Sequence, residues 1–173
     1  FNEDLMYKVA EDISNEVRAK YNGYKSFGST KIYQGLTCWA PNINIFRDPR
    51  WGRGHETYGE DPYLTAKMGS AIVRGLEGND PYYLKAVACA KHYAVHSGPE
   101  HNRHSYDARV SMYDLWDTYL PAFRELVTKA NVHGVMCAYN RFEGTPCCGH
   151  NELLQDILRN QWKFNGYVTS DCW

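Results

Sequence analysis

The sequence predicts an α/β fold in which about four β/α units share a parallel sheet, as in a partial (β/α)8 TIM-type barrel. Short apolar runs rich in β-forming residues alternate with amphipathic helical segments, and a polar loop with reactive side chains follows each run. A doubly wound sheet fits the same alternation. We favour the barrel because a barrel collects the loops that follow its strands on one rim.

The first half of the chain supplies two helices and one strand. In residues 4–21 an apolar residue recurs at every fourth position, which is typical of an amphipathic helix: Leu5, Val9, Ile13 and Val17. Residues 36–46 are short, apolar and β-rich, and Pro41 is expected to bend this strand. Pro62 suits the first turn of a second helix, which Gly78 ends.

The second half repeats the alternation. The expected strands are residues 85–90, 132–138 and 166–170, and the expected helices are residues 111–129 and 152–161. Residues 140–149 are expected to form a turn. Because parallel strands need a crossover that a helix supplies, this order predicts βαβ units.

Composition and charge exclude several classes of protein. Of 173 residues, 43% are hydrophobic and 14% aromatic, which is enough for one core and argues against disorder. The net charge of -1, from 19 basic and 20 acidic residues without a run of either sign, argues against nucleic acid or an anionic membrane as partner. No stretch reaches the roughly 18 apolar residues of a membrane span.

The two ends suggest a piece of a longer protein. Phe1 opens directly into a charged helical segment without a signal peptide, and Trp173 comes shortly after a strand-like run. We therefore expect residues 1–173 to be a single partial domain. The sequence leaves the compartment open, and a periplasmic or secreted location remains an option for the full-length protein.

The cysteines are too irregularly spaced for a disulfide scaffold: they occupy positions 38, 89, 137, 147, 148 and 172. Three of them lie in apolar runs, where Cys usually behaves as a small hydrophobe. For Cys147 and Cys148, two interpretations stay open. They either pair with other thiols in an oxidising compartment or pack as reduced side chains, and we favour packing.

Polar residues stand at the carboxyl end of each expected strand: residues 47–53 after the first, Lys91 and His92 after the second, Tyr139 and Asn140 after the third, and Asp171 after the fourth. Parallel strands bring these ends together, and cations beside a carboxylate favour its ionised form. An ionised Asp171 can attack an anomeric carbon in a retaining two-step displacement, while Arg, Lys, His and Tyr side chains bind sugar hydroxyls.

The loops contain a series of motifs: Arg47-Asp-Pro-Arg-Trp-Gly-Arg53, Glu56-Thr-Tyr-Gly-Glu-Asp-Pro62, Lys91-His-Tyr93, Val135-Met-Cys-Ala-Tyr-Asn140 and Gly166-Tyr-Val-Thr-Ser-Asp-Cys172. Together they closely resemble successive motifs of the N-terminal (β/α)8 catalytic domain of glycoside hydrolase family 3. Their order and spacing over most of the chain make the resemblance specific. The segment His96-Ser-Gly-Pro-Glu100 and the Cys147-Cys148 pair resemble the β-xylosidase and β-glucosidase branch.

The resemblance assigns roles to particular residues. It implies that Asp171 is the nucleophile and that Lys91, His92 and Arg53 hydrogen-bond the hydroxyls of the terminal sugar. Weaker inferences place three more residues at the substrate: Met136, Tyr139 and Glu100. Neither a metal nor an organic cofactor is expected.

Similar proteins also have parts that this chain lacks. Earlier barrel strands, one with a further sugar-binding aspartate, would precede Phe1, and the acid/base residue usually comes from a second α/β domain. General acid help typically contributes about 10²–10⁴-fold to the rate. We therefore expect little or no activity from this segment alone.

Less specific interpretations compete with several of these assignments. Asp171 alone fits a helix N-cap, although the surrounding motif favours a nucleophile. A zinc site formed by two histidine pairs, at positions 92 and 96 and at 101 and 104, is disfavoured because Gly98-Pro99 breaks any helix there. Arg47 and Arg50 are expected to hold the long loop by pairing with nearby acidic residues.

We expect an exo-acting β-glycosidase that removes terminal non-reducing xylose or glucose, with xylose slightly favoured. A β-N-acetylglucosaminidase of the same family ranks lower, because residues 92–98 reproduce the Gly-His motif of that branch poorly. A non-catalytic carbohydrate-binding or assembly module is the rival from another class. A half barrel would also expose strand edges, so we expect self-association.

Overall fold

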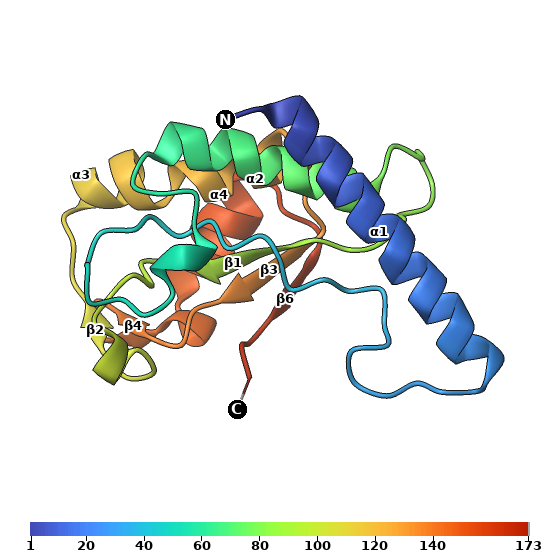
Figure 1. Cartoon of the computed structure of the whole chain (residues 1–173). Helices are drawn as coiled ribbons and strands as arrows, with labels where there is room; N and C mark the ends of the chain where they lie inside the picture. The colour runs from blue at the N-terminus through green and yellow to red at the C-terminus, as the bar shows by residue number, and fades with distance from the viewer. Residues whose placement is uncertain (173) are drawn as a thin grey trace.

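The computed structural model describes residues 1–172, in which helices cover one face of a parallel sheet (Figure 1). The main sheet has the strand order β1-β3-β6, with β1 at Cys89–Tyr93, β3 at Gly134–Cys137 and β6 at Tyr167–Thr169. Both pairs of neighbours are parallel. Strands that follow one another in both sequence and space, with a helical crossover between them, form part of a (β/α)8 barrel and confirm the predicted fold class.

Residues 36–46 extend this sheet beyond β1 without forming a continuous strand. Two isolated parallel bridges join them to β1 and the residues before it, Thr37 with Val87 and Asn42 with Lys91. The predicted bend at Pro41 falls between the two bridges, where the missing N–H of proline interrupts a ladder.

Helix α1 (Glu3–Ser26) confirms the first predicted helix and is longer than expected. The side chain of Asn2 caps it by accepting from the backbone N–H of Leu5 at 3.0 Å. The predicted apolar stripe is largely exposed: Leu5 at 59%, Val9 at 43% and Ile13 at 45%. Periodicity therefore identified the helix but not the face that packs within this chain.

Small residues explain how α1 packs against α2 (Pro62–Glu77). Ala10 and Ser14 are the buried residues of α1, and the Ser14 hydroxyl donates to the carbonyl oxygen of Gly75 at 3.1 Å. A Cβ atom at Gly75 would lie 2.5 Å from the carbonyl oxygen of Tyr7. The two helices cross closely because neither has a bulky side chain at the contact (Figure 1).

The predicted boundaries of α2 are confirmed. Asp61 caps its N-terminus by accepting from the backbone N–H of Leu64, Pro62 occupies the first turn, and Gly78 ends it with a φ of 78°.

Strand β1 begins and ends later than predicted. Lys91 and His92 were expected after a strand at 85–90, but they lie within β1. The other two predicted strands contain β3 and β6 and are confirmed, with narrower bounds. The strand boundary was misplaced because β1 continues through the polar Lys-His pair, where His92 is buried, whereas hydropathy alone predicts a loop.

The predicted helix at 111–129 is divided into three pieces. It consists of α3 (Met112–Asp114), a π-helical turn η3 (Leu115–Tyr119) and α4 (Pro121–Thr128). Pro121 has no N–H to donate to the preceding turn, which accounts for the break. The helix predicted at 152–161 is present as the π-helix η5 (Glu152–Gln161).

A second, small sheet was not predicted. It joins β2 (Asp107–Ala108), β4 (Arg141–Phe142) and β5 (Thr145–Pro146) in the order β2-β4-β5. Strands of two residues are too short to show an alternating pattern in sequence. The remaining short elements are the 3₁₀ turns η1 (Gly54–Glu56), η2 (Glu100–Asn102) and η4 (Cys147–Gly149).

The hydrophobic core lies between the main sheet and the helices. Its largest fully buried side chains include Tyr93, Phe123, Phe142, Leu126 and Leu158. Among residues 1–172, no helix combines the length and apolar character that crossing a membrane requires.

Candidate active site

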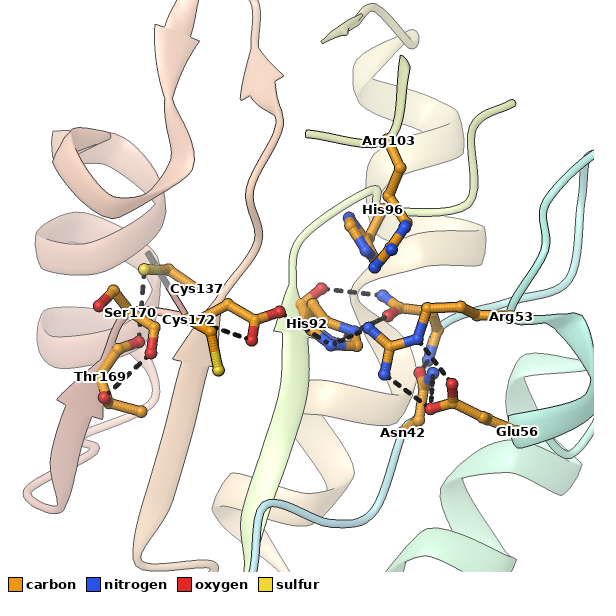
Figure 2. Close-up of polar contacts among 12 residues, drawn as sticks. Asn42, Arg53, Glu56, His92, His96, Arg103, Cys137, Thr169, Ser170 and Cys172 are labelled. Atoms are coloured by element: carbon orange, nitrogen blue, oxygen red, sulfur yellow. Dashed lines mark hydrogen bonds and ion pairs between the residues drawn. The ribbon is translucent and has the colours of Figure 1, made fainter. Parts of the chain in front are cut away.

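The predicted site residues gather at the carboxyl edge of the main sheet. Parallel register places Lys91 of β1 opposite Met136 of β3, and Met136 opposite Thr169 of β6. Asp171 follows β6 directly, while Arg53 reaches the same edge from the N-cap of η1. Figure 2 shows Arg53 extending from its loop toward His92, with Glu56 on the other side of the guanidinium.

Arg53 is held at all three of its nitrogen atoms. Its Nε and Nη2 atoms donate to the two carboxylate oxygens of Glu56 at 2.6 and 2.7 Å, and Nη1 lies 3.0 Å from Nε2 of His92. The hydrogen bonds to Glu56 raise the pKa of Arg53, and the same bonds lower the pKa of Glu56. This bidentate pair fixes a cation in one orientation beside the sheet edge.

His92 is fully buried and clamped by Asn44. The Asn44 Oδ1 atom accepts from the backbone N–H of His92 at 2.8 Å and lies 3.0 Å from ring Nδ1, while Asn44 Nδ2 donates to the His92 carbonyl at 2.8 Å. Burial, and then the positive charges of its neighbours, place the pKa of His92 far below its usual value. The ring is therefore neutral at physiological pH.

Asp171 lies beside His92 but does not form an ion pair with it. Its Oδ2 atom is 3.4 Å from His92 Nε2, and the neutral ring carries no charge to pair with it. The Oδ1 atom accepts from the backbone N–H of Cys172 at 2.8 Å, and the Asp171 side chain is 11% exposed. Within residues 1–172, Oδ2 has no hydrogen-bond partner. Asp171 is thus a nearly enclosed carboxylate with one uncommitted oxygen.

Lys91 and Tyr139 complete the surroundings of Asp171. Burial, then the charge of Arg53, lowers the pKa of Lys91, while the carboxylates of Glu56 and Asp171 oppose this shift. Burial and the negative charge of Asp171 raise the pKa of Tyr139, so its hydroxyl keeps its proton. Both side chains can donate a hydrogen bond at this edge.

Met136 and Glu100 were also expected at the substrate, but each has other contacts in the structure. Met136 is fully buried within β3. Glu100 accepts from the backbone N–H of Gly52 at 3.0 Å and from Nε of Arg103 at 2.9 Å. It therefore links the loop after residues 36–46 to the loop after β1.

His96 and Asn140 form a second buried pair beside His92. Nδ1 of His96 lies 3.0 Å from Oδ1 of Asn140, and the ring centroids of His92 and His96 are 4.5 Å apart. Burial lowers the pKa of His96 to about 4. Sequence reasoning treated His96 as an ordinary loop residue, because nothing in a single sequence joins it to Asn140.

Asn44 and Glu56 were also not predicted as site residues. Glu56 was considered only as a partner for Arg47 or Arg50, whereas Arg50 pairs with Asp48 at 2.8 Å, as expected for a loop-holding role. One signal was available for Asn44. Two asparagines at positions 42 and 44 place polar side chains on one face of an apolar strand, which is unusual unless they have partners.

The cysteines next to the site differ from the favoured expectation. Cys148 forms a disulfide with Cys137, the last residue of β3, with a Cα–Cα distance of 5.2 Å and a sequence separation of 11. Its neighbour Cys147 packs as a buried free thiol. The packing interpretation is therefore correct for Cys147 and wrong for Cys148, because the hairpin β4–β5 brings Cys148 back to β3. Within the described part of the chain, no group of three His, Cys, Asp or Glu side chains is placed to hold a metal ion.

Comparison with known proteins links this geometry to a family. Residues 25–173 match the family described as "Glycosyl hydrolase family 3 N terminal domain". A xylan 1,4-β-xylosidase of Xylanibacter ruminicola is 55% identical over 99% of this chain and 20% of its own length. β-D-xylosidase 3 of Arabidopsis thaliana is 46% identical over 99% of this chain and 22% of its own length.

Solved structures agree with these relatives. A GH3 exo-β-xylosidase in complex with a xylobiose aziridine activity-based probe superposes with a TM-score of 0.88 at 36% identity, covering 99% of this chain and 22% of the other. β-Glucosidase 3B from Thermotoga neapolitana in complex with glucose gives a TM-score of 0.83 at 34% identity, covering 98% of this chain and 21% of the other. The chain thus spans about a fifth of the length of the proteins it matches.

Proposed function

Because this chain belongs to glycosyl hydrolase family 3, we propose that it supplies the nucleophile side of the active site of a retaining β-glycosidase. The substrate is a terminal, non-reducing β-linked sugar of an oligosaccharide. Xylose is favoured over glucose, because the relatives of highest identity named above are xylosidases.

The observation that carries this proposal is the surroundings of Asp171. Its carboxylate lies at the end of a parallel strand, 3.4 Å from a neutral His92 and within the electrostatic influence of Lys91 and Arg53. A carboxylate in this position can attack the anomeric carbon and form a covalent glycosyl-enzyme, which water then hydrolyses. We expect Lys91, Tyr139 and Arg53 to donate hydrogen bonds to sugar hydroxyls.

The proton donor for the leaving group lies elsewhere in this proposal. Glu56 is bonded to Arg53 at both oxygens, and its lowered pKa prevents it from holding a proton at neutral pH. Glu100 is committed to Gly52 and Arg103. We therefore place the acid/base residue in the part of a longer protein that this chain does not include, and general acid help of about 10²–10⁴-fold would be missing from the chain alone.

We also propose that the chain is part of a larger barrel and that the full-length protein is periplasmic or secreted. The exposed apolar stripe of α1 and the edges of the main sheet are surfaces that the rest of a barrel would cover, or that would cause isolated copies to associate. The Cys137–Cys148 disulfide supports an oxidising compartment, in agreement with a periplasmic or secreted enzyme.

The test uses the full-length protein with aryl β-xyloside and aryl β-glucoside substrates. Asp171→Ala should abolish hydrolysis, and added azide should restore turnover by attacking the vacated face and giving the α-glycosyl azide. Asp80→Ala is the matched control, because Asp80 is an aspartate of the loop between α2 and β1, at the opposite edge of the sheet. Full activity in Asp171→Ala, or a first-formed product of inverted configuration, would refute the proposal.

A further inference from the structure

Asn44 makes three contacts with a single residue, and these contacts determine which atoms face each other. The Asn44 Nδ2 atom must be the one that meets the His92 carbonyl, since a carbonyl can only accept. Oδ1 must be the atom that meets the His92 backbone N–H, since an N–H can only donate. The amide orientation of Asn44 is therefore fixed by backbone groups.

That orientation determines the position of the ring proton of His92. Nδ1 lies 3.0 Å from the same Asn44 Oδ1 atom, so Nδ1 must carry the hydrogen of this bond. A neutral imidazole has only one N–H, which leaves Nε2 with a free lone pair. Arg53 Nη1, which can only donate, lies 3.0 Å from Nε2 and fits that lone pair.

The opposite tautomer would change the surroundings of the carboxylate. An N–H at Nε2 would oppose the N–H of Arg53 Nη1, 3.0 Å away, and would place a donor hydrogen beside Asp171 Oδ2, which lies 3.4 Å from Nε2. A hydrogen bond donated to a carboxylate stabilises its charge and lowers its basicity, and so weakens it as a nucleophile. The tautomer inferred from these contacts avoids both effects.

We propose that Asn44 is a positioning residue of this active site: it holds the ring proton of His92 on Nδ1, so that Nε2 accepts from Arg53 and carries no hydrogen beside Asp171. The inference deepens the proposed function and rests on it. Asn44 acts through His92 and does not itself contact the carboxylate. It is 3% exposed and lies on the segment bridged to β1 at Asn42 and Lys91.

The charged and titratable groups around His92 set the direction of its pH response. They come from several elements: Arg53 of the first loop, Lys91 of β1, His96 and Arg103 of the loop after β1, and Asp171 after β6. Among these, only Asp171 would favour a second proton on the ring. A carboxylate in place of Asn44 would add a second group that does so.

Neutron diffraction of the full-length protein tests the tautomer without any substitution. We expect a deuteron on Nδ1 of His92 and none on Nε2. A deuteron on Nε2 would overturn the proposal. This result does not depend on glycosidase activity, so it separates a failure here from a failure of the proposed function, which the Asp171→Ala experiment tests.

Two variants test the consequence for catalysis. Asn44→Leu removes the oxygen that faces Nδ1 and should lower kcat/KM by roughly 10- to 100-fold, the usual effect of losing a residue that orients a functional side chain. Asn44→Asp keeps that oxygen and should recover most of the activity at alkaline pH. Its acid limb should move to higher pH, because a doubly protonated His92 would oppose the N–H of Arg53 and carry a positive charge beside Asp171.

The matched control makes the same two changes at Asn140, which holds His96 and not His92. Asn140→Asp should leave the acid limb of the pH profile where it is in the wild type. Asn44→Leu and Asn44→Asp could instead lose the same activity at every pH while their thermal unfolding matches the wild type. The loss would then not depend on the protonation of His92, and the proposal would be wrong.

Discussion

Nη1 of Arg53 lies 3.0 Å from Nε2 of His92, and this contact joins the first loop to strand β1 at the edge where Asp171 stands. The two carboxylate oxygens of Glu56 hold the other side of the guanidinium. The orientation of one cation therefore depends on two separate segments, the first loop and strand β1.

Arg53→Lys should impair hydrolysis although the charge is kept. A lysine ammonium cannot bond both oxygens of Glu56 and His92 Nε2 at once, because it lacks the planar fork of arginine. Losing one or two such bonds corresponds to about 1.4–2.8 kcal/mol, or roughly a 10- to 100-fold loss of kcat/KM for an aryl β-xyloside. Steady-state kinetics of the full-length protein measure this.

The control for that variant is Arg50→Lys on the same loop. Arg50 pairs with Asp48, but its side chain is 71% exposed, and exposed pairs contribute little. Its kcat/KM should stay within about twofold of the wild type. Equal losses in both variants would mean that the loop as a whole, and not the clamp on Arg53, limits activity.

Glu77→Leu should destabilise the protein strongly. The buried Glu77 carboxylate accepts from the backbone N–H groups of Ala88 and His133 at 3.1 Å each and from His133 Nδ1 at 2.9 Å, so it joins the starts of β1 and β3. Leucine would leave these donors unsatisfied at a cost of about 1–3 kcal/mol each. A marked drop in the thermal midpoint is expected, whereas Glu125→Gln, which affects only the partly exposed pair with Lys67, should change it little.

Glu77→Gln should alter the pH dependence of stability. Burial raises the pKa of Glu77 above its ordinary value of 4.5, despite the opposing bonds from His133. The folded state therefore binds the proton more tightly than the unfolded state. The stability that Glu77 contributes is fully present below pH 4.5 and is lost as the pH rises through the folded pKa. Thermal midpoints of wild type and variant should diverge across that window, and parallel curves would contradict this account.

Cys148→Ala should lower stability by removing the link between β3 and the β4–β5 hairpin. A disulfide between residues 11 positions apart in the sequence stabilises the folded state by roughly 2–3 kcal/mol. Alkylation before and after reduction, followed by peptide mass mapping, should show Cys137 and Cys148 protected and Cys172 labelled without reduction. Cys147→Ala, at a buried free thiol, is the neighbouring control. Free labelling of Cys148 in the untreated protein would exclude the bond.

The isolated chain should self-associate through α1. Leu5, Val9 and Ile13 expose an apolar stripe that small-residue packing against α2 leaves uncovered. Light scattering should detect oligomers, and replacing the three residues by lysine should shift the population toward monomer. Lysine at Tyr82, which is 86% exposed in the loop after α2, is the control. Monodisperse wild-type monomer would show that this stripe does not drive association.

The order of the elements and the identity of the reactive groups could be predicted from local patterns in the sequence. Helical periodicity, a proline and a glycine predicted α2 to the residue, and the motifs around Arg53, Lys91 and Asp171 identified the family before any geometry was known. These features are local in the chain: caps, turns and strand-end motifs depend on residues a few positions apart. Such signals survive in a single sequence.

Which of these side chains bond to one another could be learned only from the three-dimensional structure. The bonds from Asn44 to His92, from His96 to Asn140 and from Cys137 to Cys148 join residues separated by 48, 44 and 11 positions. No pattern within one sequence encodes such pairings. They arise from the register of the strands, from the hairpin of the short strands β4 and β5, and from the close crossing of helices at small residues. The same packing left the apolar stripe of α1 exposed and buried Ala10 and Ser14 instead, since contact between helices depends on shape as well as hydropathy.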